Sequence, residues 1–63
     1  MRARQAKKLH NRDEVSVRGP DDKWEYGVNC IVLGEPKERD GRVTLPVNTP
    51  KWGFRQVDHT DVR

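Results

Sequence analysis

The apolar residues of this chain alternate with polar ones in short runs, and turn-forming residues separate one run from the next. Val15 and Val17 alternate with charged or hydroxyl side chains, and Val43, Leu45 and Val47 follow the same pattern further on. A period of two residues is that of a half-buried β-strand, whose successive side chains point to opposite faces. Several short strands with almost no helical pattern favour a small barrel or sandwich.

A further apolar run covers residues 24–33 and is expected to form one strand. Ile31 and Leu33 break its alternation, and a β-bulge at residues 29–31, or a strand buried on both faces, would explain the break. The alternate positions place five side chains on one face: Trp24, Tyr26, Val28, Cys30 and Val32. This face is expected to be part of the core.

Turn signals divide the rest of the chain. Asp40 and Gly41 form a dipeptide that is typical of a tight β-hairpin, and residues 19–23 are a compact turn. Pro46 cannot donate a ladder hydrogen bond, so its strand is expected to lie at a sheet edge or to kink there. Residues 58–61 are expected to form a single helical turn before a last short strand.

The length and the cysteine content limit the class of protein. The chain has 63 residues, 37% of them charged, and Cys30 is the only cysteine, so no internal disulfide is possible. Small secreted domains usually need several disulfides. The apolar runs are too short for a membrane span or a secretory signal. We therefore expect a soluble domain in a reducing interior, cytoplasmic or nuclear, either a monomer or a weak homodimer that supplements its small core.

The positive charge is concentrated at the beginning of the chain. Residues 1–12 carry a charge of +5 with no acid, whereas residues 13–63 carry eight basic and ten acidic side chains. Residues 2–9 are strong helix formers with a narrow apolar stripe, but they are too few for an independent helix. The segment is expected either to dock through Leu9 or to fray. Its five cations are Arg2, Arg4, Lys7, Lys8 and Arg12.

The order of these segments resembles that of the SH3-like and Tudor-like small β-barrels. The resemblance is one of layout and implies a mainly β, five-stranded barrel over residues 13–63, preceded by a short helix or basic arm over residues 1–12. Barrels of this kind host many unrelated functions. The segments that carry the resemblance are Asp-Glu-Val-Ser-Val at 13–17, Asp-Asp-Lys-Trp-Glu-Tyr-Gly-Val at 21–28, Gly-Arg-Val-Thr-Leu-Pro-Val at 41–47 and Phe-Arg-Gln-Val-Asp-His-Thr-Asp-Val-Arg at 54–63.

The four aromatic residues have two interpretations. The resemblance to Tudor-like domains implies a cage of three or four rings around a methylated cation, and the chain has that number. In so small a core, large rings also fill volume, and this is the interpretation that we favour for Tyr26 and Phe54. For Trp52 the sequence favours neither a core position nor an exposed contact position. The fourth ring is that of Trp24.

Residues with catalytic or metal-binding chemistry are few. His10, His59 and Cys30 show no spacing typical of a zinc site, and no phosphate-binding glycine loop is present. Cys30 lies in an apolar run and is expected to be a small buried hydrophobe. We expect a non-enzymatic protein without a metal or cofactor.

Two hypotheses for the function remain. In the first, the protein binds DNA or RNA through its basic arm, with positioning contacts from Arg42, Lys51, Trp52 and Arg55. Deleting residues 1–9 would then abolish most of the binding and leave the fold intact. In the second, the arm is only a solvated helix face, and the charge-balanced body binds a larger protein, for instance as a virus-encoded regulator or inhibitor of a host enzyme.

Overall fold

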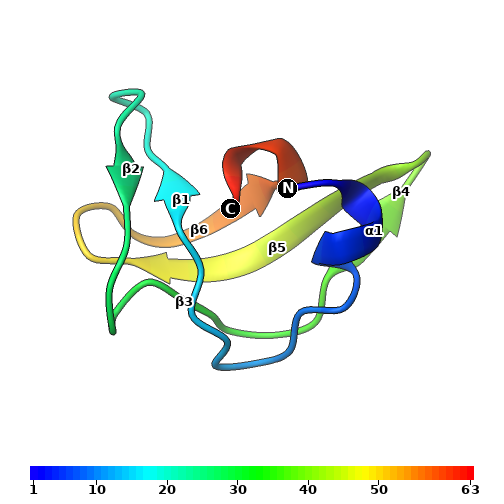
Figure 1. The fold of residues 1–63 in the computed structure, drawn as a ribbon, viewed down its shortest axis with the longest axis horizontal. Coiled ribbons are helices and arrows are strands. Elements are labelled where there is room, and N and C mark those ends of the chain that lie inside the picture. The colour runs from blue at the N-terminus through cyan, green and yellow to red at the C-terminus, as the bar shows by residue number, and fades with distance from the viewer.

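Strand β5, Arg42–Thr49, is the longest element, and most of the chain is arranged around it (Figure 1). The computed structural model describes residues 1–63. The mainly β content predicted from the alternation is confirmed. In chain order the remaining elements are α1 Ala3–Ala6, β1 Val17–Arg18, β2 Trp24–Glu25, β3 Ile31–Val32, β4 Lys37–Arg39, β6 Gly53–Asp58 and the 3₁₀ turn η1 His59–Asp61.

The strands form two antiparallel sheets, and neither closes into a barrel. In the larger sheet β3 and β4 pair with one edge of β5 and β6 pairs with the other, while β1 and β2 form a separate pair. Two isolated bridges add to this pairing: Glu14, in the segment before β1, pairs with Ile31 of β3, and Val17 of β1 pairs with Val62 near the C-terminus. Between β1 and β6 the connection is made by a side chain: Arg55 Nη1 donates to the carbonyl oxygen of Arg18 at 3.2 Å.

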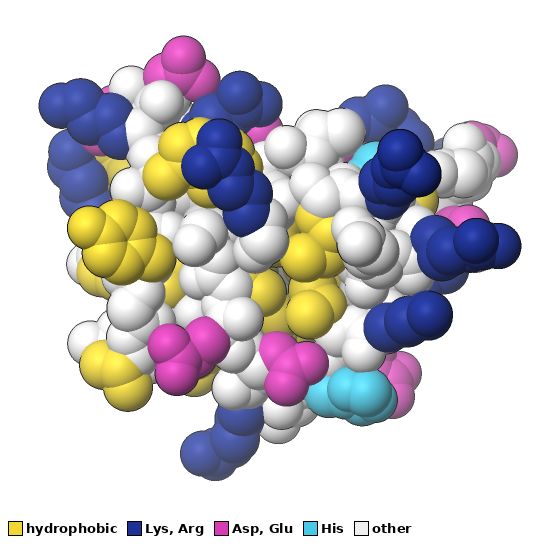
Figure 2. All heavy atoms as spheres, viewed as in Figure 1, with side chains coloured by type: hydrophobic (Ala, Val, Ile, Leu, Met, Phe, Trp, Pro, Cys, Tyr) yellow, Lys and Arg dark blue, Asp and Glu magenta, His cyan; other side chains and the backbone are white.

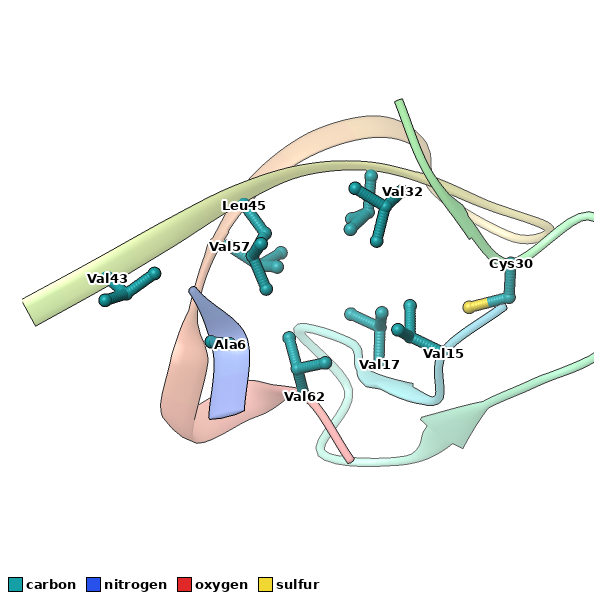
Figure 3. Packing of buried hydrophobic residues seen from close by; sticks show 10 residues of the cluster. Ala6, Val15, Val17, Cys30, Val32, Val43, Leu45, Val57 and Val62 are labelled. Carbon is teal, nitrogen blue, oxygen red and sulfur yellow. The ribbon is translucent and has the colours of Figure 1, made fainter. Parts of the chain in front are cut away.

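The core lies between the inner face of the larger sheet and the segments that cross it. Val43, Leu45 and Val47 point inward from β5 and are fully buried, as their alternation predicts. Figure 3 shows side chains from β1, α1 and the C-terminal segment on the opposite side of this core. Most core residues are valines, whose branched side chains suit strands. The ten buried hydrophobic residues are Ala6, Val15, Val17, Cys30, Val32, Val43, Leu45, Val47, Val57 and Val62.

The single strand predicted for residues 24–33 is wrong, because the chain turns in its middle. Gly27 adopts a φ of +113°, and the amide of Cys30 donates back to the Gly27 carbonyl at 3.0 Å. Glycine takes this conformation without the steric penalty that a Cβ would bring. The turn replaces the predicted bulge and leaves Tyr26 and Val28 exposed, so only Cys30 and Val32 of the predicted face enter the core.

The core role predicted for Phe54 is also wrong. The register of β6 places Val57 opposite Leu45 on the inner face, and Val57 is buried. Because side chains alternate along a strand, this register turns Phe54 outward, opposite Asn48, where 64% of it is exposed. Arg55 takes the inward position that an aromatic ring was expected to fill.

The predicted hairpin is confirmed. Of the two alternatives predicted at Pro46, an edge strand or a kink, the edge position is wrong. Asp40 and Gly41 both have positive φ, 53° and 80°, and they connect β4 to β5. Pro46 lies in β5, the central strand of its sheet. The Pro46 carbonyl accepts from the Leu33 amide at 2.8 Å, so the Pro46 nitrogen points to the same side, between β3 and β4. The sheet tolerates the missing N–H of Pro46 there because β3 ends at Val32 and β4 begins only at Lys37, so no regular strand pairs with β5 at this point.

Both ends of the chain are packed on the body. Helix α1 is shorter than the predicted 2–9, but it is docked and not frayed: Ala6 is fully buried, and Leu9, the predicted anchor, is half-buried. The predicted helical turn is confirmed as η1, capped by Asp58, which accepts from the Thr60 amide. The last predicted strand is reduced to the Val62 bridge with β1. No helix has the length and apolar character needed to cross a membrane.

Candidate functional site

Docking of α1 places the N-terminal cations beside the β4–β5 hairpin. The ammonium of Lys7 lies 2.6 Å from a carboxylate oxygen of Glu38 on β4, and α1 packs against β5. Figure 2 shows a concentration of Lys and Arg side chains over this part of the molecule, at the right of the view. We call this surface the basic end. Its cationic residues are Arg2, Arg4, Lys7, Lys8, Lys37, Arg39 and Arg42.

Most of these cations are not engaged by a carboxylate. Lys7 is paired with Glu38, and Arg42 is paired with Asp58 through two hydrogen bonds of 3.0 and 2.9 Å. The others are exposed and form no ion pair, so they are available to an anion without the loss of an existing bridge. These free cations are Arg2, Arg4, Lys8, Lys37 and Arg39.

The Arg42–Asp58 pair fixes the edge of this surface. Asp58 accepts hydrogen bonds from the hydroxyl and the amide of Thr60, at 2.6 and 3.0 Å, as well as from Arg42. These donors, Thr60 first and Arg42 next, hold the pKa of the Asp58 carboxyl well below its usual range. The carboxylate is therefore charged and already hydrogen-bonded, and it orients the Arg42 guanidinium through a bidentate contact.

The sheet register gathers the hairpin cations on one face. Lys37 lies opposite Thr44, and Arg39 lies opposite Arg42, so these side chains project on the side away from the core. With Asp58 they line an open groove of about 430 Å³, which is completed by Asp40 at the hairpin tip. Three cations around one groove favour the binding of an anionic ligand.

Two residues of the predicted site lie at the opposite end of the molecule. Lys51 and Trp52 belong to the turn between β5 and β6, about 23 Å from Arg42 along the strand. The Lys51 ammonium is 2.9 Å from Asp21 and lies over the Trp52 ring, 5.3 Å from its centroid. The Trp52 indole also lies directly against Gly19. Lys51 and Trp52 thus hold the β5–β6 turn against the β1–β2 hairpin.

Arg55 and Arg12 are also separated from the basic end. Arg55 is half-buried on the inner face of the sheet, where its guanidinium bonds to β1. Arg12 lies in the loop after α1 with a φ of 76°, and its amide donates to the Val32 carbonyl. The structure therefore brings together five of the predicted site residues: Arg2, Arg4, Lys7, Lys8 and Arg42.

Sequence reasoning missed Lys37 and Arg39. The signal for them was present, because Asp40 and Gly41 indicate a two-residue hairpin loop. Such a loop pairs residue 39 with residue 42 and places their side chains on one face. Once the hairpin is assumed, residues 37, 39 and 42 are therefore expected on one side of the sheet.

The aromatic side chains do not form an open cage for a cation. The guanidinium of Arg63 lies over the Trp24 ring, 3.9 Å from its centroid, and Arg18 lies at 5.9 Å. Lys51 covers Trp52 in the same way. Two of the four rings are thus occupied by cations of the chain itself. Phe54 carries no such cover.

The groups with metal-binding or nucleophilic chemistry are dispersed. No group of three or more His, Cys, Asp or Glu side chains is placed to hold a metal ion. Burial raises the pKa of the Cys30 thiol, which keeps it protonated and poorly reactive near neutral pH. His59 Nδ1 lies 2.8 Å from the Met1 carbonyl oxygen and ties the N-terminus to η1.

No protein-family model, no curated protein and no solved structure gives a match to this chain.

Proposed function

We propose that the protein is a small non-enzymatic binding module that engages nucleic acid through its basic end. The observation that carries the proposal is the docking of α1 beside the β4–β5 hairpin, which gathers five unpaired, exposed cations at one end of the molecule: three from α1 and its flanks on the core side of the sheet, and two from β4 on its outer side. Free cations release the counterions of a phosphate backbone when they bind it, and this release supplies most of the affinity of such modules.

The proposal extends to the architecture and the compartment. We propose that the two sheets are an opened form of the five-stranded SH3-like barrel, in which the Arg55 side chain spans the gap between β1 and β6. We also propose a reducing interior, cytoplasmic or nuclear, because Cys30 is buried as a free thiol.

Salt dependence tests the electrostatic part of the proposal. If all five free cations contact phosphates, the logarithm of the affinity should fall with the logarithm of salt concentration with a slope of about −3.5 for a single strand and −4.5 for a duplex. Fluorescence anisotropy of a labelled oligonucleotide at several salt concentrations measures this slope. A slope near zero would contradict the proposal.

A charge-matched pair of variants tests the location. The double variant Arg4→Gln with Lys8→Gln removes two free cations of the basic end and should reduce the slope by about 1.4 to 1.8. The control, Lys23→Gln with Lys51→Gln, removes two cations elsewhere and should leave the slope unchanged. Equal effects of the two double variants would mean that binding follows net charge and not this surface.

Substitutions are a better test than removal of the N-terminal segment. The sequence alone suggested that residues 1–9 could be deleted without harm to the fold. Ala6, however, is fully buried in the core, and the N-terminal ammonium donates to the Val62 carbonyl. Deletion would expose core residues and confuse a loss of binding with a loss of structure.

Binding to a larger protein is the competing outcome of the same experiments. If an affinity-tagged protein recovers one partner from a lysate equally well before and after nuclease treatment, and the anisotropy assay shows no nucleic-acid affinity, the basic end is not a nucleic-acid site.

A further inference from the structure

The outer face of the larger sheet, the side turned away from the core, carries exposed apolar side chains next to the basic end. The strand register arranges them in two adjacent cross-strand rows. Phe54, on β6, is 64% exposed, and Leu33, which directly follows β3, is 42% exposed. One row is Ile31, Asn48 and Phe54, and the next is Leu33, Pro46 and Gln56.

The same face continues into the groove of the basic end. The next row along β5 joins Lys37, Thr44 and Asp58, and the last joins Arg39 and Arg42. The row of Phe54 is four residues along β5 from the row of Lys37, which is about 14 Å. A single face therefore carries an uncovered ring at one end and three cations at the other.

The groove holds two carboxylates as well as its three cations, which leaves it a net charge of +1. Asp58 is held by Arg42 and Thr60, and Asp40 lines the groove at the hairpin tip without an ion pair. The amide of Gln56 donates to the Thr44 hydroxyl at 3.0 Å, so the polar side chains between the ring and the cations are also engaged. The free groups left to a ligand are the Phe54 ring, the aliphatic side chains and the two unpaired cations.

We propose that a single strand of nucleic acid lies along β5 on this outer face, with a base stacked on Phe54 and the phosphates held by the two unpaired cations, Lys37 and Arg39. This inference rests on the proposed function and specifies its substrate class. An unpaired strand can offer the flat side of a base to an exposed ring anywhere along its length, whereas the bases inside a duplex are stacked on one another.

Phe54 is the residue that distinguishes this site from simple charge attraction. Stacking of one base on an aromatic side chain is worth a change in affinity of roughly 5- to 150-fold. The phosphate contacts do not depend on bases. An oligonucleotide without bases should therefore keep the salt dependence and lose the contribution of Phe54.

The experiment compares three labelled probes of about 12 nucleotides, a length within the usual site size of such modules. They are an oligothymidylate, an abasic strand of the same length and a duplex, and each is titrated in the anisotropy assay. We expect the oligothymidylate to bind roughly 5- to 150-fold more tightly than the abasic strand. Phe54→Ala should remove this difference and leave the abasic affinity unchanged.

Three further variants define the role of the ring. Phe54→Leu, which remains apolar without a ring, should behave as Phe54→Ala does, whereas Phe54→Trp should keep the preference for bases. Tyr26→Ala is the matched control, since Tyr26 is 76% exposed but belongs to neither of the two rows and lies beside Glu14 and Arg63. Circular dichroism and thermal unfolding should be unchanged in all four variants, because both rings are exposed.

Each result has a defined meaning. Equal binding of the oligothymidylate and the abasic strand, or a preference for bases that survives Phe54→Ala, overturns the single-strand inference and leaves the basic end as a phosphate-binding surface. The inference also fails if the duplex binds as tightly as the single strand. Absence of binding to all three probes overturns the proposed function itself, and the outer face would then be a candidate for a protein partner.

Discussion

Replacement of Leu45 by alanine should destabilise the protein by about 3–4 kcal/mol, near the middle of the usual range for a Leu→Ala change in a core. Leu45 is fully buried and is the largest side chain of the core. Its surroundings are mostly valines on hydrogen-bonded strands, and these short, branched side chains have little freedom to fill the space that it leaves. The cavity therefore remains largely open.

The total stability of a chain of this length is only about 3–9 kcal/mol, so the loss should be easy to measure. Urea denaturation followed by tryptophan fluorescence gives the free energy of unfolding, and the melting temperature should fall by roughly 12–30 °C. If Leu45→Ala is too unstable to study, Leu45→Met, which nearly conserves the volume, should lose less than about 1.5 kcal/mol.

Leu33→Ala is the matched control. It makes the same chemical change on the outer face of the same sheet, where Leu33 is 42% exposed, and should cost less than about 1 kcal/mol. Similar losses in the Leu45 and Leu33 variants would refute the assignment of inner and outer faces, and with it the strand register from which both the core and the outer face are derived.

Three other perturbations test separate parts of the fold. Gly41→Ala should cost about 1–2 kcal/mol, because a φ of 80° is unfavourable for a residue with a Cβ although the space around it is open; thermal unfolding measures this. Gly19→Ala would place a Cβ within 2.7 Å of the Trp52 indole nitrogen, so the Trp52 indole NMR signal should shift. Because the folded pKa of Asp58 is depressed, its stabilising contribution is present above the unfolded pKa of about 3.9 and is lost as the pH falls through the folded pKa. Asp58→Asn should thus be less stable at neutral pH and lose less stability on acidification below about pH 4.

Each of these perturbations can fail in a recognisable way. An unchanged unfolding temperature in Gly41→Ala would argue against the two-residue turn with positive φ. An unmoved Trp52 signal in Gly19→Ala would argue against contact between the β5–β6 turn and the β1–β2 hairpin. Identical acid unfolding of the wild type and Asp58→Asn would mean that the Thr60 and Arg42 contacts do not hold that carboxylate.

The parts of the fold that were predicted correctly have a local cause. The alternation around Leu45 and the Asp40-Gly41 turn depend on residues adjacent in the chain, and both are confirmed. The single strand predicted for residues 24–33 was wrong because the chain turns at Gly27. Its positive φ is not revealed by the spacing of the apolar residues. The core position predicted for Phe54 was wrong because the side of the sheet on which its side chain lies depends on the register between β5 and β6. That register buries Val57 and therefore exposes Phe54.

The candidate site was predicted only in part, because its local features are visible in the sequence and its long-range contacts are not. The cations of the N-terminal segment were evident from composition, but their neighbours are set by where α1 docks, and this depends on the buried methyl group of Ala6. Lys51 and Arg55 look like free cations in the sequence. In the structure, Asp21 and the Arg18 carbonyl engage them, and these partners lie 30 and 37 residues away along the chain.

The most direct test of the basic end as the binding surface is amide chemical-shift mapping of the intact protein during titration with an oligothymidylate at low salt. We predict that the shifted amides lie in α1 and its flanks, in the β4–β5 hairpin and along the outer face near Phe54, and that the amide signals of Lys51 and Trp52 do not shift. Amide shifts concentrated at Lys51 and Trp52 and in the β1–β2 hairpin, with α1 and β4 unaffected, would contradict this prediction.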